Sequence, residues 1–271
     1  MRRANDAGAW PSSSTCLLPG AAALDTFDST MNPEYSESGA PIYRYKAREP
    51  GWTPPNMGDS NMAEIEAHIE SHIGKPTMVW HEIVSDLVHI DVHQISPTED
   101  RPYWTLVTSG MSDLPMTVPK AAGSFRFCEL MICLPKSWKM EQTDWKNEQF
   151  YWPVRWLKIC ARFPHEYKTW LSWGHTLPNG DPPSPFCAST NFSCMYLGVP
   201  RTVSKEFWHL DIRPEKKISF FALYPLYSGE VALKLKNGAE HIEELFDRNK
   251  ISEIVDLNRK DLSQKPWWKK W

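Results

Sequence analysis

The sequence predicts an α+β fold, in which a single domain contains a mixed, largely antiparallel central sheet flanked by helices. Segments with helical periodicity alternate with strand-like runs in the order helix, strands, helix, strands, helix. No internal repeat divides the chain. Its 271 residues, of which 41% are hydrophobic, are enough to bury one core.

We expect the domain to cover residues 60–258. Residues 1–59 are rich in Pro, Gly, Ser and Asn and lack a sustained period, which is typical of a disordered or loosely docked extension. Within this extension, residues 41–46 (PIYRYK) have the pattern of an extended strand that docks on the domain. Residues 259–271 end in KPWWKKW, without a periodic partner, and are expected to form a flexible tail.

The first helix is expected to begin at Asn61, a capping residue with Glu64 at the third helical position, and to end before Gly74. Its apolar stripe consists of Met62, Ile65, Ile69 and Ile73. Period-two alternation and short apolar runs then predict strands. These strands cover residues 87–95, 103–108, 127–134, 195–199 and 218–226.

Two further helices are expected, one over residues 143–167 and one over residues 239–246. Thr143 would cap the first of these. Pro153 suits the first turn of a helix, which suggests that two helical pieces meet there. Pro225 lies inside the last expected strand and suggests a bulge or a sheet edge at that point.

The leader does not have the pattern of a secretory signal, because Pro11 and Pro19 interrupt its weak apolar patch. No apolar run approaches the ~18 residues that span a bilayer, so we expect a cytoplasmic protein without a membrane partner. Met1, Met31 and Met62 stay open as alternative starts.

The net charge of −3 gives no reason to expect a nucleic-acid partner. Six cysteines occur without a C-x-x-C pair, which predicts buried, reduced thiols. Neither a dinucleotide-binding nor a P-loop glycine pattern is present, and we expect no cofactor.

The segment HEIVSDLVHIDVHQI (residues 81–95) is rich in possible metal ligands. On a strand, His89, Asp91 and His93 share one face, about 6.6 Å apart at each step of two. His89 and His93 would bind zinc if a third ligand came from elsewhere. The candidates for that ligand are His81, Asp86, His165 and His175. The favoured alternative is a polar outer face on which Asp91 pairs with its neighbours, because a carboxylate between two imidazoles favours ion pairing.

The turn in VTSGMSDLPM (residues 107–116) contains the possible nucleophiles Ser109 and Ser112. It does not match the G-x-S-x-G pattern of a nucleophile elbow. The favoured interpretation is a turn in which Ser112 or Asp113 bonds nearby backbone amides.

Residues 169–183 form a long loop that concentrates aromatic and polar side chains. Such a loop fits a binding surface, because tryptophan supplies contact area at low entropic cost. Equally, its tryptophans fit a role in fixing the loop to the core. The candidate partner-binding residues are Trp170, Trp173, His175, Asn179 and Asp181, together with Ser112 and Asp113 of the preceding turn.

The stretch YWTLVTSGMSDLPM resembles the signature region of the Suppressor of fused domain family, and further segments follow in that family's order. The resemblance extends over about residues 77–247 and is most similar to bacterial members, through its compact length and HEIVSDLVHIDVH. The other matching segments are Phe127–Pro135, Tyr151–Leu157, Ser172–Thr176, Ile218–Leu226 and Gly238–Phe246.

This resemblance implies a protein-binding domain without catalytic residues. The animal relative sequesters a transcription factor by gripping an extended peptide between two domains, and its second domain has no counterpart in this sequence. Bacterial relatives often stand beside secreted toxins, which implies an immunity protein (antitoxin) that occludes a toxin. The runner-up interpretation, from the residues alone, is a metal-dependent hydrolase that uses His89 and His93, with Asp91 as a supporting group or base.

Overall fold

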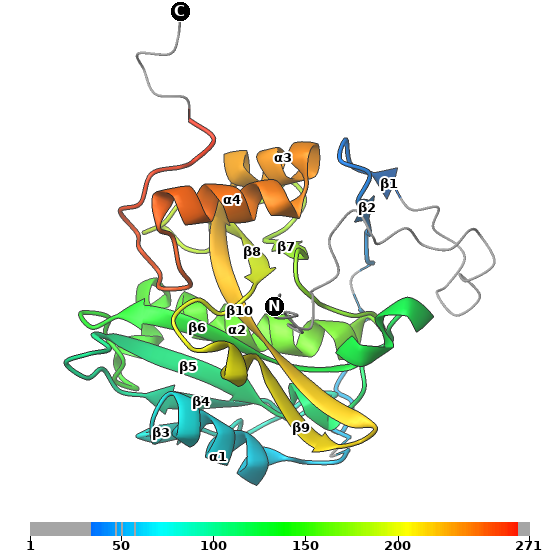
Figure 1. Cartoon of the computed structure of the whole chain (residues 1–271), viewed down its shortest axis with the longest axis vertical. Coiled ribbons are helices and arrows are strands. Elements are labelled where there is room, and N and C mark those ends of the chain that lie inside the picture. Colours follow the sequence, from blue (N-terminus) through cyan, green and yellow to red (C-terminus); the bar gives the residue numbers. More distant parts are fainter. Residues whose placement is uncertain (1–33, 47, 50, 57, 265–271) are drawn as a thin grey trace, which may run out of the picture.

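The computed structural model describes residues 34–46, 48, 49, 51–56 and 58–264, and one eight-stranded sheet forms its centre (Figure 1). The strands follow the order β3-β4-β5-β6-β10-β8-β7, and β9 also pairs with β10. Only the β6–β10 pair in this sheet is parallel, so the predicted mixed, largely antiparallel α+β fold is confirmed. The strands are β3 (Met78–Trp80), β4 (Asp91–Ile95), β5 (Tyr103–Ser109), β6 (Phe127–Pro135), β7 (Thr176–Pro178), β8 (Phe192–Gly198), β9 (His209–Arg213) and β10 (Lys216–Tyr227).

The long strand β10 connects the two halves of the molecule, as Figure 1 shows. Its first part pairs with β6 and β9, and its last part, residues 222–227, pairs with β8. Pro225 lies beyond the part that pairs with β6, where a missing N–H breaks no ladder bond on that side. The register with β8 shifts between Leu226 and Tyr227, so the irregularity expected near Pro225 is present.

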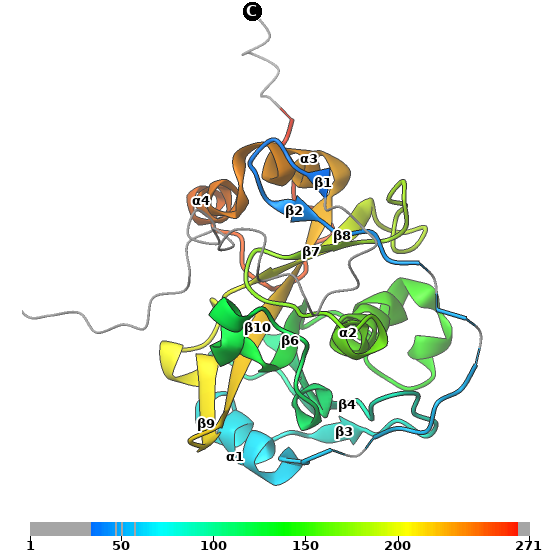
Figure 2. The same ribbon diagram turned by 90° about the vertical axis from the view of Figure 1, so that its right-hand side faces the viewer.

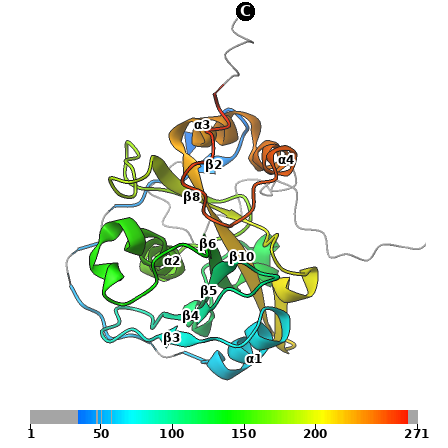
Figure 3. The ribbon, with the colours of Figure 1, turned by 90° about the vertical axis from the view of Figure 1, so that its left-hand side faces the viewer.

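Helices cover both faces of the sheet. Figures 2 and 3 show α2 on one face, and α1 and α4 at opposite ends of the other. Trp152 and Leu157 of α2 belong to one buried cluster, whereas Ile65 of α1 and Phe246 of α4 belong to the second. The helices are α1 (Met62–His72), α2 (Glu148–Glu166), α3 (Ser228–Asn237) and α4 (Ala239–Asn249), with 3-10 turns η2 (Met111–Asp113), η3 (Lys120–Phe125), η4 (Asp144–Lys146) and η5 (Lys205–Trp208).

The first expected strand, residues 87–95, is shorter in the structure than its alternating sequence pattern predicted. Strand β4 begins at Asp91, because Leu87 adopts a left-handed conformation with φ of 68°. The backbone of Leu87 bonds to Thr53 and Asn56 instead of to a sheet neighbour. A segment far away in the sequence therefore replaces the strand partner.

Helix α2 is continuous through Pro153, so the prediction of two helical pieces meeting there is wrong. Asn147, and not Thr143, caps the helix by accepting a hydrogen bond from the backbone N–H of Gln149 at 3.0 Å. The long buried face of α2 offsets the one hydrogen bond that Pro153 cannot donate. Helix α3 was not expected from the sequence.

The described chain packs beyond both expected domain boundaries. Strands β1 (Glu34–Tyr35) and β2 (Pro41–Ile42) form a short antiparallel pair, and the Ser38 N–H donates to the Leu235 carbonyl at 3.0 Å. After residue 258, Leu262 packs against the second core cluster. The predictions for residues 1–33 and for the KPWWKKW tail from residue 265 lie outside the described residues.

Among the described residues, the five cysteines are free thiols, four of them buried. No helix in this part of the chain has the length and apolar character needed to cross a membrane.

Arg259 fixes the final described segment to α3. Its guanidinium donates to both carboxylate oxygens of the fully buried Glu230, at 2.5 and 2.6 Å, and also to the Pro225 carbonyl at 2.8 Å. The same group stacks over the rings of Phe192 and Tyr227, each at 4.8 Å. This bidentate, stacked geometry is specific to arginine.

We predict that Arg259→Met lowers the free energy of unfolding by about 3–5 kcal/mol, because it leaves the buried Glu230 carboxylate without its partner. Urea denaturation measures this loss. The matched control is Arg248→Met, which breaks an exposed pair with Glu244 one helical turn away and should cost no more than about 0.5 kcal/mol. Equal losses in the two variants would contradict the assigned role of Arg259.

Candidate functional site

The turn η2 is held from below by a buried carboxyl group. Glu129 on β6 is fully buried. Its Oε1 accepts hydrogen bonds from the Ser112 backbone N–H at 2.9 Å and from the Ser112 hydroxyl at 2.6 Å, and its Oε2 accepts one from the Thr108 hydroxyl at 2.6 Å. Burial raises the pKa of Glu129 to about 7, although these hydrogen bonds oppose the shift. The sequence signal was a lone acid within the apolar run FCELMICLP, which was not recognised as a site.

Two further contacts fix the same turn. Gly110 has φ of 101°, and a Cβ at this position would lie 1.9 Å from the His89 carbonyl oxygen. Only glycine fits so close to that backbone. On the other side, His165 Nε2 donates to the Met111 carbonyl at 2.9 Å, and burial lowers the pKa of this imidazole. The turn is thus held against the backbone before β4, to β6 and to helix α2.

The serines of the turn region have structural partners. Ser112 is fully buried and Asp113 is 8% exposed, so neither side chain presents a surface to a partner. Ser109 lies 2.9 Å from Nε2 of His93, and both residues are buried. Burial lowers the pKa of His93. This Ser–His pair has no access to a substrate in this structure.

The long loop is fixed to the core by its aromatic side chains. Trp173 packs against both core clusters and donates from Nε1 to Glu243 at 3.1 Å. Trp170 meets the His175 ring edge-on at 4.6 Å. Burial, with a smaller effect of nearby Lys234, lowers the pKa of His175 to about 4, so this imidazole is neutral at physiological pH.

The tip of this loop is open. Asn179 holds its shape by donating to the Ser184 and Pro185 carbonyls, at 2.9 and 3.0 Å. The Asp181 side chain is 71% exposed and pairs with Arg44. Of the seven predicted partner-binding residues, Asp181 therefore has the most accessible polar group.

The described residues 43–46, 48, 49, 51–56, 58 and 59, which we call the strap, lie between β2 and α1, and Figure 2 shows them passing α2. Near its start, Tyr45 packs against Phe163 and Tyr167, and its hydroxyl lies 2.8 Å from that of Thr169. At its end, the Asp59 N–H donates to the Asp113 carbonyl at 3.0 Å. The strap therefore contacts both the long loop and the turn that the sequence singled out.

The strap also supports an exposed apolar feature. The side chains of Ile83 and Val84, between β3 and β4, are 98% and 75% exposed. Trp52 of the strap is 62% exposed and donates from Nε1 to the carbonyl of Ser85 in the same loop, at 2.8 Å. We call Trp52, Ile83 and Val84 the apolar tip.

Ion pairs stiffen the loop on both sides of the apolar tip. Glu82 pairs with Arg162 of α2 at 2.6 Å, and Asp86 pairs with Arg48 of the strap at 2.6 Å. Burying large exposed apolar side chains in a partner is favourable, and such groups mark interaction surfaces when they are clustered. The sequence signal was the pair Ile-Val between charged residues, which was not recognised.

The histidine-rich segment forms a cluster different from the one expected. His81 Nδ1 lies 2.9 Å from Oδ2 of Asp91, and His89 Nε2 lies 2.9 Å from Oδ1 of the same carboxylate. Among the described residues, these three are the group whose donor atoms converge, within 4.8 Å of one another. His93 lies outside the cluster because it is buried against Ser109, so the runner-up pair His89 and His93 does not share an ion site. His81 was one of the four candidates for the third ligand.

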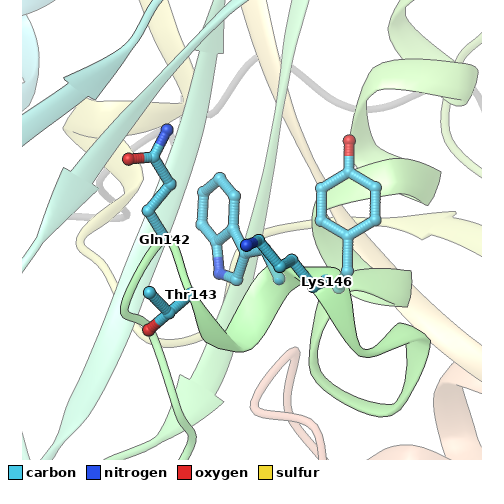
Figure 4. Close-up of a pocket in the computed structure, with 5 residues that line it drawn as sticks. Gln142, Thr143 and Lys146 are labelled. Atoms are coloured by element: carbon cyan, nitrogen blue, oxygen red, sulfur yellow. The ribbon is translucent and has the colours of Figure 1, made fainter.

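A shallow, open hollow of about 440 Å³ lies beside η4. Figure 4 shows Gln142, Thr143 and Lys146 at the hollow, which Trp145 and Tyr151 also line. The Trp145 indole packs against Trp80 with the ring centroids 4.1 Å apart and the ring planes tilted by 43°. The hollow contains none of the clustered histidines, so it does not join them into a catalytic cleft.

A family model described as Suppressor of fused protein (SUFU) matches residues 86–260, which is more than half of the chain. The chain belongs to the Suppressor of fused family. The family resemblance predicted from YWTLVTSGMSDLPM is thereby confirmed, and the matched part contains the turn, the long loop and the buried Glu129.

Solved Suppressor of fused structures share the fold at low sequence identity. A homologue from Neisseria gonorrhoeae has a TM-score of 0.53 and 18% identity, with 75% of this chain and 97% of that chain covered. A structure of the Sufu–Fu complex has a TM-score of 0.53 and 11% sequence identity, with 76% of this chain and 93% of that chain covered. Drosophila Suppressor of Fused has a TM-score of 0.51 and 10% sequence identity, with 75% of this chain and 50% of that chain covered. No curated protein matches the sequence.

The raised pKa of Glu129 predicts a pH dependence of stability. In the unfolded chain this carboxyl titrates near its ordinary pKa of 4.5, and in the folded protein near 7. The contribution of protonated Glu129 to the free energy of unfolding is therefore fully present below pH 4.5 and is lost as pH rises through 7. It amounts to a decrease in unfolding free energy on the order of 3 kcal/mol.

Urea denaturation across this pH range tests the prediction in the Glu129→Gln variant, which removes the titrating group and keeps its shape. Between pH 4.5 and 7, the wild type should lose about 3 kcal/mol of unfolding free energy relative to this variant. Glu244→Gln, at an exposed residue of α4, is the matched control and should show the same loss as the wild type. Superimposable pH profiles for the wild type and Glu129→Gln would refute the prediction.

Proposed function

We propose that this chain is a non-enzymatic protein-binding domain that acts as an immunity protein (antitoxin), binding a toxin and occluding its working cleft. The observation that carries the proposal is the apolar tip, where Ile83 is 98% exposed on a loop held by ion pairs at both sides. A preformed apolar protrusion enters a partner's cleft without a large ordering cost.

Energetics support the apolar tip as a binding centre. Complete burial of an Ile or Val side chain contributes about 1.5–3 kcal/mol, and aromatic side chains such as Trp52 are frequent at the centres of interfaces. The ion pairs of Glu82 and Asp86 leave fewer loop conformations to be lost on binding. The tip alone therefore accounts for several kcal/mol of affinity.

The family supports a protein as the ligand. A structure of similar fold comes from the Sufu–Fu complex. The resemblance to bacterial members that stand beside secreted toxins supplies the toxin as the partner class. The net charge of −3 and the exposed Asp181 suit a basic partner, such as a nuclease, through charge complementarity.

The proposal predicts that the double variant Ile83→Asp/Val84→Asp fails to protect cells. The test is co-expression with the protein encoded by the reading frame beside this one in the source genome, with growth as the measurement. Wild-type protein should restore growth, and purified variant should bind the toxin at least about 100-fold more weakly, because two apolar contacts become buried charges.

The melting temperature should change little in the double variant, since both side chains are exposed in the free protein. Tyr35→Asp provides the matched control, as an exposed apolar residue on β1 beside α3, and should keep full protection. Failure of the wild-type protein to bind the toxin would overturn the proposed function. Full protection by the double variant would remove the apolar tip from the interface.

A further inference from the structure

The His81, His89 and Asp91 cluster arises from the pairing register of β3 and β4. Trp80 pairs with Val92, which places His81, the residue after β3, opposite Asp91 at the start of β4. His89 lies two residues before Asp91 and turns back onto the same carboxylate. His89 and Asp91, at the start of β4, and His81, just after the end of β3, thus bring their metal-binding atoms together.

We propose that His81, His89 and Asp91 bind a divalent transition-metal ion, and that zinc is the ion that fits best. Two imidazole nitrogens and a carboxylate oxygen are a ligand set of zinc sites that keep one position for water. In a tetrahedral site with bonds near 2.0–2.1 Å, ligand atoms lie about 3.3 Å apart. Each imidazole nitrogen is already 2.9 Å from an Asp91 oxygen.

The surroundings supply the supporting contacts that a metal site needs. The Ser85 hydroxyl lies 2.6 Å from His89 Nδ1, so it can accept that N–H when Nε2 faces the ion. The backbone N–H of Glu82 donates to Asp91 Oδ1 at 3.1 Å and fixes the carboxylate. These two contacts orient both ligands before any ion arrives.

The charge distribution also favours a cation. The Asp91 side chain is 5% exposed and contacts the imidazoles of His81 and His89. The nearby cations Arg162 and Lys158 pair with Glu82. A divalent ion would bring its positive charge into direct contact with this buried carboxylate.

Ligand chemistry distinguishes the ion class. Calcium takes six to eight oxygen ligands and magnesium retains several waters, whereas imidazole suits zinc, nickel and cobalt. The His81 side chain is 63% exposed, so it can turn to close the remaining distance, and the fourth position faces water. Because His81 and His89 bracket residues 82–88, the ion would hold both ends of the loop that carries Ile83 and Val84.

Metal titration of the untagged, chelator-treated full chain tests the proposal, with a competing zinc dye as the readout. One equivalent of zinc should bind. His81→Ala and His89→Ala should each weaken binding at least about 100-fold, and Ser85→Ala, which removes a supporting contact, about 10-fold. Cobalt should give the visible spectrum of a tetrahedral nitrogen–oxygen site, and zinc should slow proteolytic cleavage within residues 82–86.

His72→Ala is the matched control, because His72 is an exposed histidine on α1 outside the cluster, and its zinc affinity should equal that of the wild type. Circular dichroism confirms that each variant is folded. The absence of saturable zinc binding, or binding that persists in both His81→Ala and His89→Ala, would overturn the metal site. Neither result bears on the toxin-binding assay, so the two proposals fail separately.

Discussion

The burial of one carboxyl group in the sheet is the constraint on which much of this structure depends. Glu129 can occupy the interior only because Thr108 and Ser112 donate hydrogen bonds to it, so β5, β6 and the turn between them must adopt one arrangement. Loss of that arrangement would leave an unsatisfied buried acid. The turn in turn fixes the position of Gly110 against the backbone of His89.

From this turn the contacts extend to the surface features. The Asp113 carbonyl accepts a hydrogen bond from the N–H of Asp59 at the end of the strap. The middle of the strap bonds to the backbone of Leu87 and, through Trp52, to the loop that contains Ile83 and Val84. The exposed side chains of Ile83 and Val84 are therefore held by a segment that the sequence suggested was loosely docked. A surface held in this way loses few conformations when a partner binds it.

Sequence patterns located part of the candidate site. The Gly-Met-Ser-Asp turn, the long loop and the histidine-rich segment could be located from the sequence, because each is marked by glycine, aromatic or histidine residues close together in the chain. The contacts that these residues make could not be predicted from the sequence. Ser112 hides beneath the surface because Glu129, seventeen residues away, binds it. His81 replaces His93 near Asp91 because strand pairing and the left-handed Leu87 together redirect the chain.

By itself, the sequence determined the kinds of elements, the α+β class and the family, since hydrophobic periodicity, caps and turn residues act over a few neighbouring positions. Only the tertiary structure decided that helix α2 continues through Pro153, that the strap contacts the predicted loop, and which apolar side chains stay exposed. Those outcomes depend on pairing register and on packing between segments distant in the chain. A local pattern carries no record of such partners.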